Sequence, residues 1–428
     1  MALFHQQEDT EKGPQMTTAR NFYIGLSLVF AFLTLAVGQA LLDKAGVSAQ
    51  SGEPLPVFEV DPTWPKPLPN NWVIGGVVGV SVDPMDRIWI MHRPSFIAAN
   101  ERAAADVLSS VCCFPAPPVL AFDQSGNLVK AWGPQRKPSS PGSAISESTE
   151  IISGWEHWAQ SEHGIYVDYK GFVWTGGNGQ KDSRVLKFTQ DGKFVMEIGA
   201  LAPYGTDGPG HDGGPDSHDT KYFNKPATMV VDPRTDELYV ADGYGNRRVI
   251  VFDANTGEYK RHWGAYGNEP DENDTYNDRR GGVDTDYDPN VVSTQFGRAT
   301  HGVRVASDGK VYVADRTNNR VQAFRTDGTY LSEGFIDRYA LGFGSAFDLA
   351  LSPDPEQRFI YTADGMNQRV VVLDRDTMQI LTSFGRGGPY PSQMYALHSI
   401  AADSRGNVYT GETLHGRRVQ RWSYRGMR

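Results

Sequence analysis

Histidine occupies the same position in three of the six copies of a phrase that the chain repeats. When the copies are aligned on the residue that follows their second apolar run, the residues that open the first run are Val78, His163, Ala227, His301, Phe347 and His398. Three converging imidazoles form the ligand set of an open tetrahedral zinc site, with the fourth position left to water or substrate. For one histidine alone, a turn residue with a hydrogen-bonded ring is the competing interpretation, but its occurrence in every second copy favours a metal. Three histidines fall outside the alignment and are expected at the surface or in packing: His157, His262 and His415.

Arginine and tyrosine mark a second aligned position, directly after the second run. The residues there are Arg93, Asn178, Gly243, Arg316, Gly365 and Thr413. Tyr244 stands one place further on in the third copy. Two guanidiniums suit a carboxylate ligand because their donor forks match it bidentately, and a phenol near a cation and two arginines can act as a general base. An ion pair with an aspartate of a neighbouring blade is the alternative for each arginine, and it is the role expected of Arg247, Arg320 and Arg369.

The repeated phrase also predicts the elements that must hold these side chains. In each copy apolar and polar residues alternate over short runs separated by turns of the Asp-Gly type, as in HGVRVASDGKVYVADR at 301–316. Such runs are antiparallel strands joined in a meander. Six meanders predict an all-β domain, a six-bladed β-propeller whose first strands line a central channel. Because blades two, four and six lie about 120° apart and the second strand returns to the face where the first began, both sets would meet at one channel mouth.

Segments outside the six phrases complete this architecture. The last copy stops at Arg428 without an outer strand, and PVFEV at 56–60 is expected to complete the sixth blade and close the ring. Insertions interrupt the pattern at about 94–118, 134–157, 201–225 and 265–298, and the last two, which are acidic and rich in glycine, are expected as loops that cap one face. Phrases such as DGYGNRRV and DRTNNRV resemble the NHL repeat family of propellers, which implies the fold but no activity.

The N-terminal region predicts export. Residues 22–42 are 21 residues without a charge, long enough to cross a bilayer as a transmembrane or signal-anchor helix. A cleaved signal peptide is the alternative. The expected parts are a polar segment 1–21, the helix 22–42, a linker 43–56 and the propeller 57–428. The propeller is then expected on the periplasmic or extracellular side of a membrane, or secreted if the signal is cleaved.

Composition limits the partners and the cross-links of this chain. A net charge of −10 over 428 residues argues against a nucleic-acid partner, since such proteins concentrate basic residues. The only cysteines, Cys112 and Cys113, are adjacent, so they form either a vicinal disulfide or two free thiols. Without a disulfide framework, the stability of the fold must come from its buried core.

From about residue 56 onward the chain resembles the peptidyl-α-hydroxyglycine α-amidating lyase family, six-bladed propellers in which three histidines hold a catalytic zinc. The similar motifs are VSVDPMDRIWIMHR with Arg93, EHGIYVDYKGFVWT with His163, VADGYGNRRV with Tyr244, THGVRVASDGKVYVADRTNNRVQAF with His301 and Arg316, and LHSIAADSRGNVYTGE with His398. The resemblance implies zinc on the three histidines, Tyr244 as proton acceptor, and two arginines that hold a substrate carboxylate. It implies a lyase that splits an N-acyl- or peptidyl-α-hydroxyglycine into a primary amide and glyoxylate, with a separate monooxygenase supplying that substrate.

The chain departs from this family at a second metal site. The resemblance implies calcium on the backbone carbonyls of Val80 and Ile165 and on a carboxylate, but the carboxylate position is Ser399. Calcium is therefore expected to be absent or held differently. Two other functions remain open: a related metal-dependent hydrolase or lactonase, and a non-catalytic NHL-type propeller that binds a protein or glycan. The alternating histidines favour an enzyme, because a binding propeller has no need for them.

Overall fold

The computed structural model describes residues 54–102, 105, 111–134, 155–201, 214–274 and 288–428. Within these residues no helix is long and apolar enough to cross a membrane. The segment predicted to be a transmembrane or signal-anchor helix, residues 22–42, lies outside them. The helices described are three short 3-10 turns: η1 (Pro94–Phe96), η2 (Ala99–Glu101) and η5 (Ala265–Gly267).

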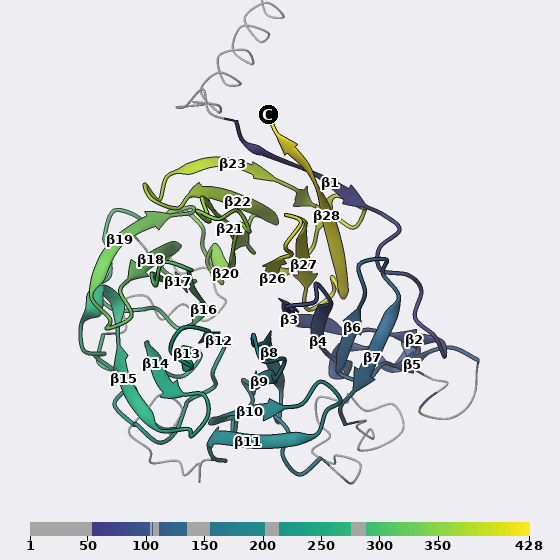
Figure 1. The fold of residues 1–428 in the computed structure, drawn as a ribbon, viewed down its shortest axis with the longest axis horizontal. Coiled ribbons are helices and arrows are strands. Elements are labelled where there is room, and N and C mark those ends of the chain that lie inside the picture. The colour runs from purple at the N-terminus through teal and green to yellow at the C-terminus, as the bar shows by residue number, and fades with distance from the viewer. Residues whose placement is uncertain (1–53, 103–104, 106–110, 135–154, 202–213, 275–287) are drawn as a thin grey trace, which may run out of the picture. The chain divides into compact units, whose positions relative to one another are not determined.

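Residues 54–428 form a ring of six four-stranded antiparallel sheets, as the repeats predict (Figure 1). The first three blades are β3 (Gly76–Val82), β4 (Ile88–Arg93), β6 (Val119–Phe122) and β7 (Leu128–Trp132); β8 (Glu162–Val167), β9 (Val173–Gly177), β10 (Arg184–Phe188) and β11 (Phe194–Gly199); and β12 (Thr228–Asp232), β13 (Glu237–Asp242), β14 (Arg248–Asp253) and β15 (Tyr259–Trp263). The next two are β16 (Thr300–Val305), β17 (Val311–Asp315), β18 (Arg320–Phe324) and β19 (Tyr330–Phe335); and β20 (Ala346–Leu351), β21 (Phe359–Asp364), β22 (Arg369–Asp374) and β23 (Ile380–Phe384). The sixth is β26 (Leu397–Ala402), β27 (Val408–Glu412), β28 (Arg418–Met427) and β1 (Pro56–Asp61). The first strands touch in the order β3, β8, β12, β16, β20 and β26, and β26 returns to β3.

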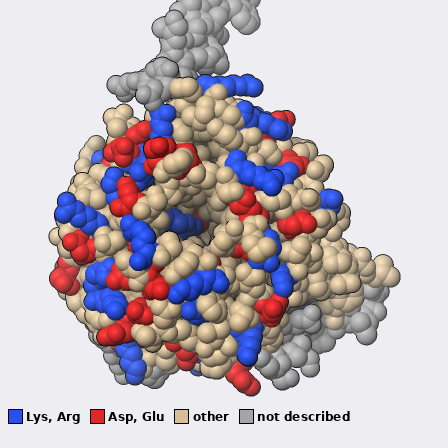
Figure 2. Space-filling view, viewed as in Figure 1, with Lys and Arg blue, Asp and Glu red and all other residues tan. Residues whose placement is uncertain are grey.

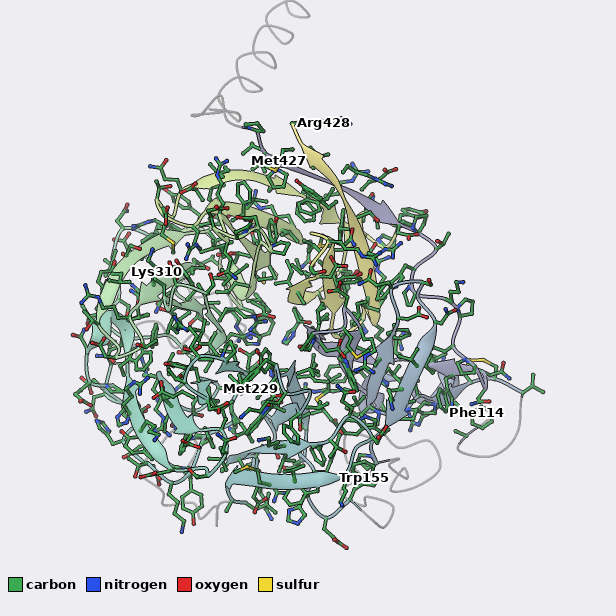
Figure 3. All side chains as sticks on the ribbon, in the orientation of Figure 1. Phe114, Trp155, Met229, Lys310, Met427 and Arg428 are labelled. Atoms are coloured by element: carbon green, nitrogen blue, oxygen red, sulfur yellow. A yellow bond between two sulfur atoms is a disulfide. The ribbon has the colours of Figure 1, made fainter. Side chains whose placement is uncertain are left out.

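The two ends of the described chain close the ring. β1 pairs with β28 as the outermost strand of the sixth blade, which confirms the prediction for PVFEV. Pro56 lies opposite Met427, and the backbone N–H of Arg428 donates to Leu55 over 2.9 Å. Met427 and Arg428 are labelled at this closure in Figure 3. This pairing gives the sixth blade its fourth strand, so that it has as many strands as each of the other five blades.

The hydrophobic core lies between facing blades rather than inside any one of them. Trp174 and Val185 of the second blade pack with Leu238 and Ile250 of the third. Every residue of β9 is buried, whereas in the outer strand β11 only Ile198 is buried, so burial decreases from the inside of this blade to its edge.

An aspartate builds the turn between the first and second strands. Asp83 accepts the backbone N–H of Arg87 and the indole N–H of Trp89, both over 2.9 Å. Asp168 makes the same indole contact with Trp174 in the second blade. In these two blades the Asp therefore closes a turn and satisfies a buried tryptophan at once, and in the sixth blade Asp403 accepts the hydroxyl of buried Tyr409 over 3.0 Å.

Two short parallel pairs lie outside the blades. β2 (Trp72–Val73) pairs with β5 (Phe114–Pro115), and β24 (Arg386–Gly387) pairs with β25 (Gln393–Met394). Directly before β5, Cys112 and Cys113 are joined in a disulfide, which decides between the two states that the sequence left open.

Bulges in the first strands determine where the channel side chains point. The pairing of first and second strands is interrupted by one extra residue, which is His301 in β16, His398 in β26 and Gly164 in β8. Gly164 has φ of 71°, a conformation that favours glycine, and it directly follows His163. β3 and β20 carry the same interruption. Since a bulge bends its strand and redirects a side chain, these positions present imidazoles at the start of the channel.

A fourth histidine, His92, is a core residue that makes stability depend on pH. Its Nδ1 accepts the N–H of Gly75 over 3.1 Å and its Nε2–H donates to the Pro117 carbonyl over 3.0 Å. Burial lowers the pKa of His92 to about 4. Between about pH 6.5 and pH 4, His92 is therefore protonated in the unfolded chain but not in the folded one. At pH 5 this difference should lower the free energy of unfolding by about 2 kcal/mol. Urea unfolding should show that the stability difference between the native protein and His92→Gln shrinks by that amount from pH 7.5 to pH 5; a constant difference would contradict the assignment.

Candidate metal centre

Three imidazoles meet at one end of the channel, one each from β8, β16 and β26. His163, His301 and His398 are 1%, 0% and 5% exposed. Their ring centroids lie 4.7 to 5.1 Å apart, and their planes are inclined by 72° to 84°. Each offers a ring nitrogen, and the three nitrogens lie within 4.8 Å of one another. The structure thus brings together the three histidines that the alignment of the repeats singled out.

Backbone carbonyls of neighbouring blades orient two of the three rings. His163 Nδ1 lies 2.9 Å from the Ala227 oxygen, and His301 Nδ1 lies 2.5 Å from the Phe347 oxygen. Because a carbonyl only accepts, Nδ1 carries the proton in both rings and Nε2 keeps its lone pair. His398 Nδ1 is buried and has no hydrogen-bond partner among the described residues.

The three imidazoles are neutral in this environment. Burial, with the positive charge of Arg93 next in size, lowers the pKa of His163 to about 3. Burial also lowers the pKa of His301 and His398 well below the usual value, and the adjacent imidazoles and Arg316 act in the same direction. Neutral imidazole is the form that ligates a metal, since a bound proton would occupy the same lone pair.

The spacing of the nitrogens fits a zinc ion. Zinc–nitrogen bonds at the tetrahedral angle separate two ligand atoms by about 3.3–3.4 Å. The Nε2 atoms of His163 and His398 lie 3.3 Å apart. No partner of Nδ1 fixes the tautomer of His398, so this contact is either a hydrogen bond between the two rings or, with both nitrogens unprotonated, a pair of lone pairs that one cation can bridge. Three neutral imidazoles, two of them oriented by carbonyls, match the donor set of an open zinc site.

Tyr244 lies beside the three histidines. It belongs to the turn after β13, and its phenol oxygen lies 3.0 Å from His163 Nε2 and 3.1 Å from His301 Nε2. Arg316 Nη1 donates to the same oxygen over 3.3 Å, and its guanidinium lies 5.2 Å from the ring centre. The phenol oxygen is therefore in reach of a group bound at the metal position, and a positive charge stands next to it.

Two arginines at the site lack the carboxylate partner that buried arginines elsewhere in the ring have. Among the described residues, neither Arg93 nor Arg316 forms an ion pair. Arg93 donates to the Glu162 carbonyl over 2.7 Å and to the side-chain oxygen of Asn178. Arg316 is 7% exposed, and its Nε has no hydrogen-bond partner among the described residues. Two guanidiniums with donors to spare at one mouth make an anion site.

Two of the arginines expected to form ion pairs with a neighbouring blade do form ion pairs, but with an aspartate of their own blade. Arg320 pairs with Asp315 over 2.8 Å and Arg369 pairs with Asp364 over 2.9 Å. In the third blade Arg248 forms this ion pair, with Asp242 over 2.9 Å, and Arg247 donates to the Phe296 carbonyl over 3.3 Å. The phrase there contains two successive arginines, and only the one opening β14 lies opposite Asp242 in the ladder.

The residues implied for calcium do not fit that ion. Ser399 is uncharged, and its buried hydroxyl has no partner among the described residues. The buried carboxylate of Asp348, which accepts the N–H of the residue after Ser399, is already paired with Arg304 over 3.0 Å. Arg304 and Val80 both line a channel cavity of about 190 Å³ that the last residues of the first strands surround. Calcium sites are built largely from carboxylates, so the carbonyls of Val80 and Ile165 with a neutral hydroxyl make a poor one, and a guanidinium already supplies positive charge.

Some groups at the site escaped the sequence analysis. Asn178 stands in the same aligned position as the arginines, so the alignment contained a signal for it, but its contact with Arg93 depends on the packing of two blades. The carbonyls of Ala227 and Phe347 carry no sequence signal, because every residue has one. Phe347, in the column of the histidines, has its ring 5.9 Å from that of His301 and 6.0 Å from that of His398.

The centre of the ring is hollow on the face shown in Figure 2. Acidic and basic side chains are interspersed around that hollow, with no continuous patch of one sign.

Comparison with known proteins agrees with the repeat architecture. A family model described as NHL repeat matches residues 301–324, the segment that includes His301 and Arg316. NHL repeat-containing protein 3 of Mus musculus is 22% identical over 337 residues, covering 76% of this chain and 70% of that protein. A solved structure of streptogramin B lyase covers 86% of this chain and 98% of its own, with 13% identity and a TM-score of 0.47.

A second group of relatives are alpha-amidating monooxygenases. Peptidyl-glycine alpha-amidating monooxygenase A of Xenopus laevis is 26% identical over 380 residues, 86% of this chain and 33% of that protein. Peptidylglycine alpha-amidating monooxygenase of Rattus norvegicus is 25% identical over 260 residues, 58% of this chain and 22% of that protein. The chain thus spans about a third or less of the length of these curated relatives. It is an all-β six-bladed propeller that contains an NHL repeat and is similar, over most of its own length, to part of the alpha-amidating monooxygenases.

Proposed function

We propose that this protein is a zinc-dependent lyase that cleaves N-acyl- or peptidyl-α-hydroxyglycine to a primary amide and glyoxylate. The observation that carries the proposal is one constellation: three neutral imidazoles converge within 4.8 Å, beside a phenol and two arginines without ion-pair partners. Each of these groups has a counterpart in such a substrate, which carries a hydroxyl, a carboxylate and a departing amide on one carbon.

The arginines would hold the substrate by its carboxylate. Arg316 has donors that no described residue uses, and Arg93 is fixed in direction by Asn178 and the Glu162 carbonyl. Bidentate donors fix both the position and the orientation of a carboxylate. The substrate carbon would thereby be placed with its hydroxyl toward the imidazole nitrogens and the Tyr244 oxygen.

Zinc on His163, His301 and His398 would lower the pKa of the substrate hydroxyl. Tyr244 would accept the hydroxyl proton, and Arg316, whose Nη1 donates to the phenol oxygen, would stabilise the charge that develops there during proton transfer. As the carbon–oxygen double bond of glyoxylate forms, the carbon–nitrogen bond breaks and its electron pair moves to the amide nitrogen. Tyr244 would return the proton to that nitrogen, so the reaction consumes and releases no other species.

The relatives give coarser support to the same reaction class. Their names describe alpha-amidation of peptidyl-glycine, and the proposed products include an amide. Because this chain matches only about a third of the Xenopus protein, the proposal takes from it no monooxygenase step. A separate monooxygenase would supply the hydroxylated substrate, and residues 22–42 would direct the propeller out of the cytoplasm.

Metal analysis combined with a product assay tests the proposal. The full-length protein should contain about one zinc per chain, by the three-ligand argument, and should release glyoxylate from α-hydroxyhippurate. Removing the zinc with a chelator should abolish glyoxylate release, and adding zinc back should restore it. A zinc-loaded protein that releases no glyoxylate but hydrolyses esters or lactones would instead support a related hydrolase on the same scaffold. A folded protein that binds no zinc would exclude both metalloenzymes and favour a binding propeller.

A further inference from the structure

Apolar side chains occupy two positions around the channel mouth that correspond to that of Tyr244. Tyr244 stands two residues after the end of the second strand of its blade, where it reaches the imidazole nitrogens. Met366 stands two residues after β21, and Leu414 two residues after β27. Because the blades repeat the same geometry, Met366 and Leu414 border the same mouth from the fifth and sixth blades.

These side chains are exposed although they are large and apolar. Met366 is 40% exposed, Leu414 46% and Phe343, from the loop before β20, 44%. Phe343 and Met366 are close, since a Cβ added to Gly342 would lie 3.2 Å from the Met366 methyl carbon. Clustered apolar surface at the rim of a pocket marks a place where a ligand is bound.

The exposed groups continue inward to the metal centre through Phe347. Phe347 is 7% exposed, and its ring lies about as close to His301 as to His398, at 5.9 and 6.0 Å. A Cβ added to Gly365, the residue before Met366, would meet the Phe347 ring at 2.5 Å. We call Phe343, Phe347, Met366 and Leu414 the apolar shelf.

The two unpaired arginines stand at the two ends of the apolar shelf. The Arg316 guanidinium lies 5.7 Å from the Phe343 ring centre and 4.9 Å from that of Phe347. At the other end, the Arg93 guanidinium lies 5.3 Å from the ring centre of Phe96. A Cβ added to Gly76 would meet both the Phe96 ring, at 2.4 Å, and the backbone nitrogen of Leu414, at 2.8 Å. The shelf, on the fifth and sixth blades, therefore lies between Arg316 of the fourth blade and Arg93 of the first, the two groups proposed to hold the carboxylate.

The opposite side of the mouth is polar. Tyr244 and Asn178 come from the third and second blades, and Asn178 binds Arg93. A substrate whose carboxylate is held by the arginines and whose hydroxyl faces the imidazoles must direct its acyl group toward one side or the other. The exposed apolar surface on the side of the fifth and sixth blades matches an apolar acyl group.

We propose that the apolar shelf binds the acyl group of the substrate, so that the enzyme selects α-hydroxyglycines with an aromatic or aliphatic acyl substituent. This inference rests on the proposed lyase function and adds the substrate class. Covering Met366, Leu414 and Phe343 removes apolar surface from water, which strengthens binding of a bulky apolar acyl group and does nothing for a small one.

The test compares two substrates that differ only in the acyl group. We expect kcat/KM for N-benzoyl-α-hydroxyglycine to exceed that for N-acetyl-α-hydroxyglycine by at least about tenfold, the order of discrimination that an apolar pocket provides. In the double variant Met366→Ser, Leu414→Asn the ratio should fall to about threefold or less, with the rate for the acetyl substrate unchanged. Asparagine is chosen because Leu414 has φ of 48°, which asparagine tolerates.

A matched control separates the shelf from a general effect of losing exposed apolar groups. Met85 is 73% exposed in the turn that follows β3, at the opposite end of the first strands. Met85→Ser should leave the substrate ratio at its native value. A native ratio near one, or a high ratio that survives the double substitution, would overturn the shelf while leaving the lyase intact. Absence of glyoxylate from both substrates would overturn the proposed function, and the shelf with it.

Discussion

Replacing His301 with alanine should abolish zinc binding and lower glyoxylate release by at least about 10³-fold. Metal-assisted polarisation of an oxygen is worth several kcal/mol of barrier, and about 4 kcal/mol corresponds to that factor. His301 is completely buried, and its ring nitrogen lies within 4.8 Å of those of His163 and His398, so the substitution removes one of three converging donors. Zinc affinity should fall by more than about 100-fold, since even the loss of an outer hydrogen bond to a ligand costs 10- to 100-fold.

The same substitution should have a limited effect on the metal-free fold. The imidazole of His301 makes one described hydrogen bond with the protein backbone, to the Phe347 carbonyl, and leaving that oxygen unsatisfied costs about 1–3 kcal/mol. Removing one of the converging lone pairs offsets part of this cost. In chelator, the free energy of unfolding of His301→Ala should therefore lie within about 3 kcal/mol of the native value. Added zinc should raise the melting temperature of the native protein but not that of the variant, because ligand binding stabilises only a competent folded state.

His415 provides the matched control for this experiment. It is an exposed histidine in the turn between β27 and β28, and the alignment of repeats placed it outside the metal set. His415→Ala should keep native zinc content, native activity and the zinc-dependent rise in melting temperature. If His301→Ala retained its zinc, or if it lost its fold in chelator while His415→Ala did not, His301 would be a structural residue and the ligand set would be wrong.

The sequence was sufficient to predict the ring because the same pattern of short strands and turns recurs in each of the six blades. Alternation with period two, Asp at the turn and a closing strand from the N-terminal side are local signals, and they reappear in β1 to β28. The alignment of repeats converts these local signals into a three-dimensional prediction, since residues at one register position must surround one axis. This is how residues as distant in sequence as His163 and His398 could be placed together.

What the sequence did not reveal depends on contacts between blades. The one-residue bulges that turn His301 and His398 toward the channel could not be recognised in the sequence of β16 or β26. No particular residue type marks the extra position in either strand. The pairing of Arg304 with Asp348 joins two neighbouring first strands, and neither residue stands in a position that the repeats mark. These contacts place the Arg304 guanidinium beside the carbonyl of Ile400, the residue after Ser399, and they arise only when neighbouring blades pack together.

Replacing Tyr244 with phenylalanine should retain the zinc and lower kcat by about 10²–10⁴-fold, the range for loss of a positioned general base. The phenol oxygen is the atom that lies 3.0 and 3.1 Å from two imidazole nitrogens, while the ring itself packs edge-on against His163 at 4.9 Å. Phenylalanine keeps the ring contact and removes the oxygen. KM should change much less than kcat, because Arg93 and Arg316, not Tyr244, are proposed to hold the carboxylate.

Zinc content and a second tyrosine make this result interpretable. Tyr395 is 51% exposed, in the loop before β26, and Tyr395→Phe removes a phenol oxygen from the same end of the blades without touching the histidines. That control should keep the native kcat. If Tyr244→Phe lost zinc together with activity, the phenol would be a metal ligand whose role is to hold the ion. If its rate equalled that of Tyr395→Phe with zinc in place, proton transfer would have to pass through another group, and the proposed mechanism would lose its base while the metal site remained.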